Sequence, residues 1–360
     1  MIDTITIRAP LSELLPGMDK QQELRWLRAW DVQTSSGFPR WYRNPIPQEK
    51  QSGKYYPTLT AYKDRAHYWR PVIKMQFSVA KLFWGNNLNE LENSHLLPVA
   101  SKLQERLIEM GLRPSREVLL RASVVNLHYS KNILLEHGHI TSQVIQHLNR
   151  IQAGGRLQKR NMQYARGGSG INLYNKSFCF SIYDKLEEVE STLEVPLDAD
   201  GRKPEVLRLE ARLENKDKLN HIFEKLDIGH NPTFQEVFDS EKSRRVVTHI
   251  WQTLVAPQAA LVTDSDDTAN DIIQKIMRHI PNITLHKAIK VTSMVMSART
   301  PGGLSELKTI VLNHKNQRMW ARLYQEIKEA NQAMETVETD WWQQVETQLA
   351  EYEPLALIEN

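Results

Sequence analysis

Tyr183 is a side chain whose type and position could carry chemistry. The segment Phe178–Tyr183 alternates apolar and polar residues, which predicts a strand with Tyr183 and then Lys185 on its polar side. A nearby ammonium group favours the phenolate form of tyrosine, and a phenolate is a nucleophile. Taken alone, the pattern is more typical of an amphipathic tyrosine at a sheet edge.

Glu210 lies in a second alternating segment, Leu207–Leu213, between Arg208 and Arg212 on the polar side. A carboxylate between two arginines stays ionised and could bind a divalent cation, while the arginines grip a phosphate. A ladder of solvent-exposed ion pairs between strands would give the same pattern, and on its own it is at least as good an explanation.

Asn126 and His128 flank Leu127, so a strand would present both polar side chains on one face. An amide and an imidazole side by side could both approach a metal ion. A single histidine is more often structural than a ligand, so this segment is only a candidate metal site.

Strands and helices must position these groups. Alternation predicts strands over residues 73–79, 171–174 and 178–183 and over 207–213, and a largely buried strand over 118–129. Helical spacing predicts helices over 96–110 and 141–151, the latter capped by Thr141 or Ser142. After Pro257 the pattern is helical, so we expect an α+β domain followed by a smaller helical one.

The distribution of charge points to a polyanionic ligand. From His137 to Tyr183 there is no Asp or Glu, and the segment contains several glycines, Tyr164 and Tyr174. Its cations are Arg150, Arg156, Lys159, Arg160, Arg166 and Lys176. A flexible basic loop with flat side chains would neutralise phosphates and stack on bases, which predicts binding of single-stranded nucleic acid. A solvated basic loop is the weaker alternative.

The C-terminal third is basic and then acidic. Two helices are expected over 304–312 and 317–330, with helix-turn-helix proportions and with Arg318 and Arg322 on the second, a weak DNA-binding signal. From Glu329 onward there are eight acids and no Lys or Arg. We expect this acidic tail, which contains Trp341 and Trp342, to compete with DNA for the basic surface.

Composition excludes several classes of protein. The chain has 360 residues, 41% hydrophobic and 25% charged, and a net charge of +3, which excludes general disorder. Its one cysteine excludes a disulfide scaffold and a cysteine-cluster metal site. No segment predicts a signal peptide or a membrane span, so we expect a cytoplasmic protein. The expected boundaries are 1–256 for the α+β domain, 268–331 for the helical domain and 332–360 for the acidic tail.

These separate signals occur together in one family. The chain resembles the replication initiators of filamentous bacteriophages, the gene II product type, over most of its length outside residues 14–70. The Leu-Arg-Leu-Glu-Ala-Arg-Leu block at 207–213 is the most specific match. The other similar segments are Met1-Ile2-Asp3, Pro71-Val72-Ile73-Lys74, Ser78-Val79-Ala80-Lys81, Gly85-Asn86-Asn87, residues 143–148, Ile182-Tyr183-Asp184-Lys185 and the helix pair around Arg318.

The resemblance implies an antiparallel-sheet nickase fold of the HUH-like, Rep-like kind and rolling-circle replication. Such an enzyme nicks one strand of double-stranded origin DNA, leaves a 5′-phosphotyrosine and a free 3′-OH, and later closes single-stranded circles. It further implies a divalent metal, Mg²⁺ or Mn²⁺, and a host bacterial cytoplasm. A host replicative helicase and polymerase are the implied partners, and oligomers on DNA are an option.

The resemblance also assigns roles by position. Tyr183 would be the nucleophile, with Lys185 beside it, and Glu210 a metal ligand. The family commonly has an Arg-apolar-Asp strand before the helix at 143–148, and here Asn126-Leu127-His128 occupies that place. His128 would then replace the carboxylate as a ligand, with Asn126 next to it. The DNA-binding residues would be Arg156, Lys159, Arg160, Tyr164, Arg166, Lys176, Arg208, Arg212, Arg318 and Arg322.

Two alternatives remain open from the residues. A non-enzymatic DNA-binding replication or regulatory protein would share every basic feature and lack only the metal-dependent cleavage. An RNA-binding structural protein is the third option. If Tyr183 is not the nucleophile, Tyr174, Tyr164 and Tyr129 are the remaining candidates.

Overall fold

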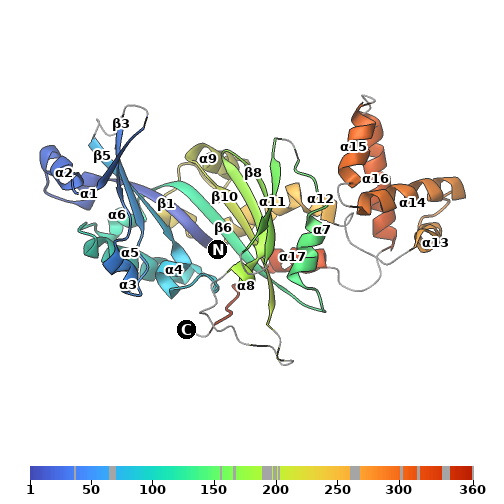
Figure 1. The fold of residues 1–360 in the computed structure, drawn as a ribbon, viewed down its shortest axis with the longest axis horizontal. Coiled ribbons are helices and arrows are strands. Elements are labelled where there is room, and N and C mark those ends of the chain that lie inside the picture. The colour runs from blue at the N-terminus through green and yellow to red at the C-terminus, as the bar shows by residue number, and fades with distance from the viewer. Residues whose placement is uncertain are drawn as a thin grey trace.

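A single antiparallel sheet organises the chain in this computed structural model (Figure 1). The structure describes residues 1–35, 38–64, 70–154, 156–164, 168–188, 197, 201, 203–259, 268–300, 303–313, 317–334 and 341–358. The strands lie in the order β2-β3-β4-β5-β1-β6-β10-β9-β8-β7. Their bounds are β1 Ile2–Pro10, β2 Asp31–Ser35, β3 Phe38–Arg43, β4 Thr58–Asp64, β5 Arg70–Ser78, β6 Ser123–Leu135, β7 Gln158–Gln163, β8 Ser169–Asn175, β9 Phe178–Asp184 and β10 Glu205–Leu213.

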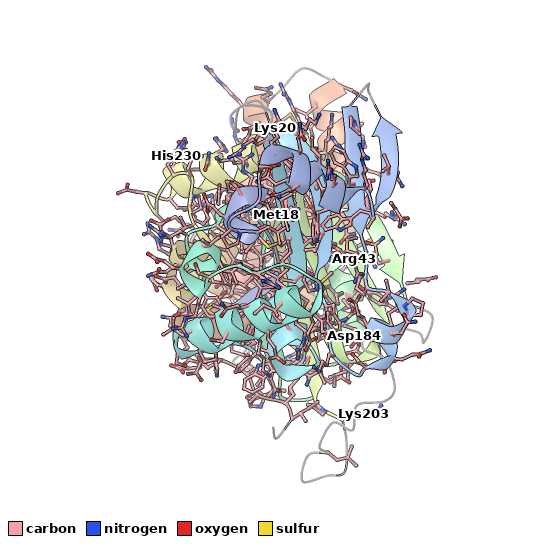
Figure 2. All side chains as sticks on the ribbon, turned by 90° about the vertical axis from the view of Figure 1, so that its left-hand side faces the viewer. Met18, Lys20, Arg43, Asp184, Lys203 and His230 are labelled. Atoms are coloured by element: carbon pink, nitrogen blue, oxygen red, sulfur yellow. The ribbon has the colours of Figure 1, made fainter. Side chains whose placement is uncertain are left out.

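Helices cover one face of the sheet. The longer ones are α5 Leu96–Glu109, α7 Thr141–Leu148, α9 Lys216–Lys225, α11 Ser240–Leu254, α13 Ala269–His279, α14 Leu285–Arg299, α15 Gly303–Asn313, α16 Gln317–Met334 and α17 Trp341–Glu351. The shorter ones are α1 Leu11–Leu14, α2 Lys20–Leu27, α3 Pro47–Gln51, α4 Val79–Trp84, α6 Arg116–Leu120, α8 Lys185–Glu188, α10 Phe234–Val237 and α12 Ala256–Ala259. In Figure 2, His230, which follows α9, lies on one side of the strands, and Arg43 and Asp184 lie on the other.

The two faces of the sheet follow from the strict alternation of side chains along each strand. On β1, Ile5 and Ile7 are fully buried, and on β10 Leu209 and Ala211 are. These side chains pack beneath helices α4, α9 and α11, which contact β1, β6 and β10. The opposite face presents polar side chains and is called the open face below.

The two halves of the sheet have the same connectivity. In the first half, β1 is central, β5 pairs with it, and β4, β3 and β2 follow outward. In the second half, β6 is central, β10 pairs with it, and β9, β8 and β7 follow outward. In both halves the central strand leads into a helical segment and then a meander whose last strand returns to the centre. β1 and β6 join the halves by antiparallel pairing.

Several expectations are confirmed and others need correction. The class is α+β with a large antiparallel sheet, and β5, β8, β9 and β10 lie where alternation placed them. The strand expected over 118–129 begins later and runs further, because Arg116–Leu120 forms α6 under a Ser115 cap. The expected cap of α7 is absent; the Thr141 hydroxyl instead donates to the Glu205 carboxylate at 2.7 Å.

Much of the expected basic loop is a strand. Residues 158–163 form β7, the outermost strand of the second half. Nearly all its side chains are exposed, so no buried face leaves an apolar pattern in the sequence. The expected domain boundary at 257–267 lies mostly outside the described residues. Helices α13, α14, α15 and α16 pack on one another.

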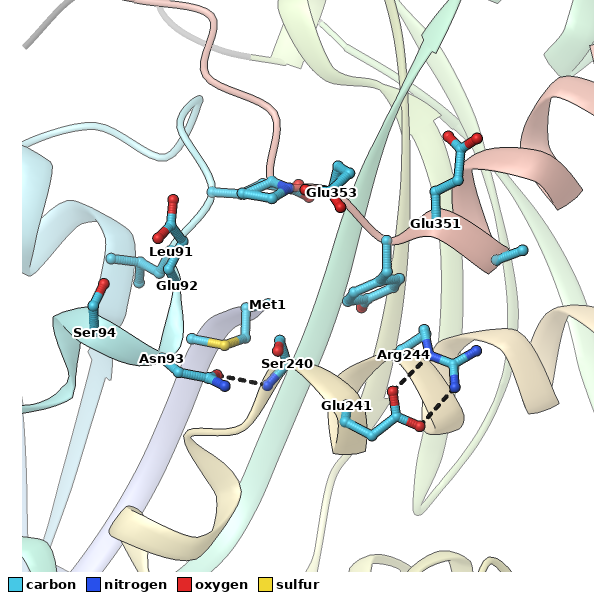
Figure 3. Close-up of a pocket in the computed structure, with 14 residues that line it drawn as sticks. Met1, Leu91, Glu92, Asn93, Ser94, Ser240, Glu241, Arg244, Glu351 and Glu353 are labelled. Atoms are coloured by element: carbon cyan, nitrogen blue, oxygen red, sulfur yellow. Dashed lines mark hydrogen bonds and ion pairs between the residues drawn. The ribbon is translucent and has the colours of Figure 1, made fainter.

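The C-terminal segment is part of the core, which corrects the expectation of a competing tail. Trp341, Val345 and Leu349 of α17 are buried at 0–1% exposure. The Gln348 amide donates to Leu134 O and accepts from Leu134 N, completing the edge of β6 beyond the start of β1. Figure 3 shows Glu351 and Glu353 continuing past the start of α11, where Ser240 and Arg244 lie. Because Trp341 holds α17 in the core, this helix is not available to cover the open face.

Candidate metal centre and tyrosine

Three neighbouring strands bring the candidate ligands together on the open face. Asp3 comes from β1, His128 from β6 and Glu210 from β10, and one ligand atom of each lies within 4.8 Å of the others. Asp3 and Glu210 are 9% and 2% exposed. The cluster could hold a metal ion, since two carboxylates and an imidazole are common ligands of divalent metals.

Asp3 reaches the cluster through an irregularity in β1. Strict alternation would place Asp3 on the same face as the buried Ile5 and Ile7. The β1–β6 register shifts between Ile2 and Thr4, and a β-bulge of this kind redirects a side chain. The Asp3 carboxylate then accepts hydrogen bonds from the Thr4 hydroxyl at 2.8 Å and from Arg208 at 2.6 Å.

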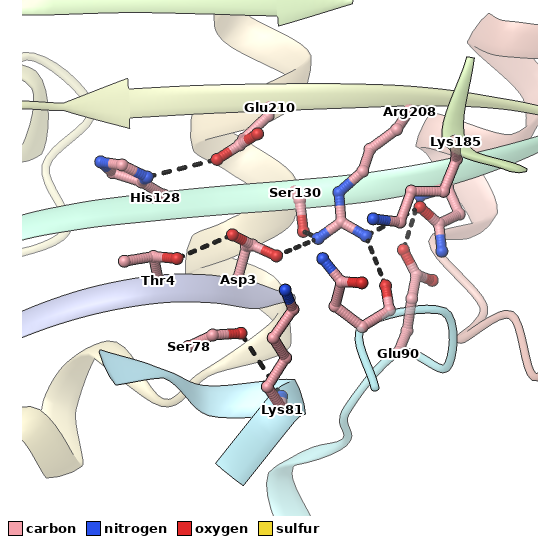
Figure 4. A network of polar contacts seen from close by, with 12 residues as sticks. Asp3, Thr4, Ser78, Lys81, Glu90, His128, Ser130, Lys185, Arg208 and Glu210 are labelled. Carbon is pink, nitrogen blue, oxygen red and sulfur yellow. Dashed lines mark hydrogen bonds and ion pairs between the residues drawn. The ribbon is translucent and has the colours of Figure 1, made fainter. Parts of the chain in front are cut away.

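Arg208 is a positioning residue inside the protein. It is 3% exposed, and besides Asp3 it donates to the Ser130 hydroxyl at 2.8 Å and to Asn132 Oδ1 at 3.2 Å (Figure 4). A further bond to Asn87 O connects it to the chain after α4. The expectation that Arg208 contacts DNA is therefore replaced by a role in holding Asp3.

His128 and Glu210 are joined by a charged hydrogen bond. His128 Nδ1 lies 3.2 Å from Glu210 Oε1, and its Nε2 lies 3.6 Å from Glu214 Oε2. Burial lowers the pKa of His128, but its bonds to Glu210 and Glu214 outweigh burial and raise it to about 9. Burial raises the pKa of Glu210, yet His128 and Arg212 hold it well below its usual range. A metal ion would thus replace a proton on His128.

The buried Nε2 of His128 makes no hydrogen bond to a described residue, and Glu214 Oε2 lies just beyond hydrogen-bond distance from it at 3.6 Å. One imidazole nitrogen of His128 and the carboxylates of Asp3 and Glu210 form a donor set that fits a divalent ion and does not choose between Mg²⁺ and Mn²⁺. Asn126, expected as a ligand, instead donates to Glu214 Oε2 at 2.9 Å. Asp3, and not Asn126, is the third candidate ligand beside His128 and Glu210.

Tyr183 lies against this cluster. Its hydroxyl donates to Glu210 Oε2 at 3.3 Å, and Arg212 donates to the same oxygen at 2.9 Å. Tyr183 is 4% exposed, and burial together with the charge of Glu210 raises its pKa well above 10. The ring of Tyr164 lies 6.0 Å from that of Tyr183, between centroids.

Lys185 does not activate Tyr183 as expected. β9 ends at Asp184, and Lys185 begins α8, fully buried, with its Nζ 2.6 Å from Glu188 Oε2. The ammonium lies 5.9 Å from the centre of the Tyr183 ring, above the ring and paired with a carboxylate. Among the neighbouring cations, Arg208 acts to lower the pKa of Tyr183, and His128, Arg212 and Arg208 lower the pKa of Glu210.

The absence of a side chain at Gly170 leaves space for Tyr183. Gly170 lies directly opposite Tyr183 in the β8–β9 pairing. A Cβ at Gly170 would lie 2.6 Å from the Tyr183 Cβ and 2.9 Å from Ile182 O, closer than atoms can approach. A glycine of the acid-free segment is therefore needed for the position of the tyrosine.

The remaining expected DNA contacts divide between the faces. Arg160 and Arg212 are on the open face, and Lys176 is exposed in the turn between β8 and β9. Lys159 points to the helix side, where its Nζ donates to Asn149 O and Ile151 O at the end of α7. Arg156, Arg318 and Arg322 are exposed, away from the cluster, and Arg166 lies outside the described residues.

Sequence reasoning missed Asp3, Arg208's role and Gly170. In β1, Asp3 occupies a position where the alternation of Ile5 and Ile7 predicts an apolar residue, and this was the available signal for Asp3.

No helix in the described part of the chain is long and apolar enough to cross a membrane. No family model, curated protein or solved structure matches the chain.

Proposed function

We propose that the protein is a metal-dependent DNA nicking and closing enzyme that initiates rolling-circle replication, with Tyr183 as its nucleophile. The observation that supports this most is the bond from the Tyr183 hydroxyl to Glu210, a residue of the Asp3–His128–Glu210 cluster. Transesterification requires a nucleophile, an acceptor for its proton and compensation of charge on the phosphate, and Tyr183, Glu210 and a metal at the candidate centre would supply them.

In this proposal the Tyr183 oxygen attacks the phosphorus of a phosphodiester and the bond from phosphorus to the 3′ oxygen breaks. The DNA 5′ end remains on Tyr183 as a phosphotyrosine, and the 3′ oxygen leaves as a hydroxyl after taking up a proton. Glu210 is the carboxylate placed to receive the tyrosine proton. A divalent metal held by Asp3, His128 and Glu210 would supply charge compensation at the phosphate.

Closing is the reverse reaction. The stored phosphotyrosine keeps the energy of the phosphodiester, so a 3′-OH can attack it and release Tyr183 without a nucleotide cofactor. Arg212, partly exposed beside Glu210, is placed to contact a phosphate oxygen during both steps.

The test uses a matched pair of tyrosines. Tyr183 lies on β9 and Tyr62 lies on β4, the strand at the corresponding place in the first half. With Mn²⁺ and supercoiled DNA that carries the origin, Tyr183→Phe should bind DNA yet form neither nicked circles nor an adduct on denaturing gels. Tyr62→Phe and the unaltered protein should both form nicked circles and the adduct.

Mass spectrometry of the DNA-linked peptide identifies the nucleophile directly. An adduct that persists in Tyr183→Phe, or a linked peptide containing Tyr164, would overturn the assignment of Tyr183. Binding without nicking at any metal concentration would instead support the alternative of a non-enzymatic DNA-binding protein.

A further inference from the structure

A recess of about 460 Å³ opens on the open face beside the candidate metal centre. It is lined by Arg160, Asn172, Tyr174, Asn175, Lys176, Cys179, Arg212 and Glu214. Cross-strand pairing places Arg160, Asn172, Ser181 and Glu210 in one row across β7, β8, β9 and β10. The recess therefore adjoins the cluster, because Arg212 lines the recess and donates a hydrogen bond to Glu210 of the cluster.

Its charges favour an anion. Arg160 and Lys176 are exposed and form no ion pair among the described residues. Arg212 binds Glu210 through one nitrogen, while its buried Nε has no hydrogen-bond partner. The only carboxylate in the lining, Glu214, accepts from Asn126 at 2.9 Å and faces His128. Three cationic groups thus line the recess, and its one carboxylate, Glu214, already interacts with Asn126 and His128.

Its remaining side chains favour a nucleobase. Tyr174 is half-buried in the wall and offers a flat ring of the kind on which bases stack. The Oδ1 atom of Asn172 is buried without a hydrogen-bond partner, so it can accept from the amino group of a base. A volume of this size lies within the usual range for small-ligand sites, about 300–1,000 Å³.

We propose that this recess binds one unpaired nucleotide of single-stranded DNA next to the phosphate at the reaction centre, with its base on Tyr174 and its phosphate between Arg160 and Lys176. The assignment deepens the proposed function. It rests on that function because the neighbouring nucleotide reaches the reacting phosphate only if Tyr183 is the nucleophile. A single strand is the occupant because a base inside a duplex is paired and stacked and cannot enter a recess in a sheet. Asn172 then favours bases with an amino group over thymine.

Binding is measured by fluorescence anisotropy of the full chain with a labelled single-stranded oligonucleotide in EDTA, which prevents cleavage. Tyr174→Ala should weaken binding roughly 5- to 100-fold, the usual range for loss of one stacked base, while Tyr174→Phe keeps it. Lys176→Gln, a change in an exposed turn, should lower the slope of log K against log salt by about 0.7. The control Lys225→Gln on α9, which lies against the helix-bearing face of β6 and β10, should leave the slope unchanged.

Binding of both Tyr174→Ala and Lys176→Gln equal to that of the unaltered protein would overturn the proposal. An equal loss on fully paired duplex would overturn the assignment to an unpaired nucleotide. If Asn172 selects the base, the unaltered protein should bind oligo-dA more tightly than oligo-dT, and Asn172→Ala should bind the two equally. Equal binding of the two by the unaltered protein would show that Asn172 has no such role. Adduct formation at saturating DNA with Mn²⁺ reports separately on Tyr183, so either proposal can fail alone.

Discussion

The two halves of the sheet share a connectivity but carry different groups on the open face. In the second half, β6 presents His128, β10 presents Glu210 and Arg212, and β9 presents Tyr183, linked by hydrogen bonds. In the first half, the strands at the corresponding places, β5 and β4, present Lys74, Thr60 and Tyr62, with Arg8 beside them on β1. Among the described residues, two carboxylates and an imidazole converge where the halves meet, because Asp3 on β1 lies beside His128 and Glu210 of the second half.

The difference lies in how charge is compensated. In the second half, buried acids are balanced by Arg208, Arg212 and a protonated His128, an arrangement that a metal ion can enter by replacing a proton. In the first half, Arg8 pairs with Asp64 at 3.1 Å, while Lys74 lies 5.3 Å above the Tyr62 ring. Burial and the charges of Arg40 and Arg8 lower the pKa of Lys74. The open face of the first half therefore carries basic side chains, whereas the second half contributes His128 and Glu210 to the candidate metal centre.

The largest difference between the halves is expected when a carboxylate is removed from each, and the change in the second half is Glu210→Gln. In Glu210→Gln we expect affinity for Mn²⁺, measured by calorimetry, to fall by more than about 100-fold, because one of three ligands is lost and even groups behind the ligands contribute roughly 10–100-fold. The adduct should disappear with it. The matched change in the first half is Asp64→Asn, which removes a carboxylate from an ion pair and should leave metal affinity unchanged. Equal metal binding by both variants would place the metal elsewhere.

Gly170→Ala should have an intermediate effect confined to the second half. The new methyl group meets the Tyr183 Cβ at 2.6 Å, so the strands must shift. Overpacking of this kind costs about 1–3 kcal/mol, to be measured by urea denaturation, and should slow adduct formation. Gly154→Ala is the control, since a Cβ there meets no atom within 4 Å. If both variants are equally stable and active, Gly170 does not position Tyr183.

Apolar alternation located β5, β8, β9 and β10, but β1 and β4, which also have a buried face, were not predicted as strands, and β7 has no such pattern. β5, β9 and β10 pack one face beneath helices, so apolar alternation marks them. β7 is an outer strand with almost every side chain exposed, and no local pattern distinguishes it from a loop. The duplicated connectivity was equally hidden, because the halves share an order of strands and no residue motif.

Two of the three candidate metal ligands could be predicted for a similar reason. Alternation placed Glu210 and His128 on polar faces, and the β6–β10 pairing brought these faces together. Asn126 and His128 occupy alternate positions on β6, so both were expected on the polar face as ligands. Asn126 instead donates a hydrogen bond to Glu214. Asp3 required knowledge of a β-bulge that depends on pairing with a strand more than a hundred residues away.

Lys74→Gln should give the smallest change and the sharpest view of the first half. If the basic open face of that half holds the phosphates of duplex DNA beside the nicking site, loss of one contact should lower the slope of log K against log salt by about 0.9. Adduct formation at saturating DNA should not change, because Lys74 contacts none of the three candidate ligands. Lys20→Gln on α2, which packs against β5 from the other face, is the control. An unchanged slope in Lys74→Gln would mean that the two halves share a connectivity without sharing the DNA, and that the second half binds its substrate alone.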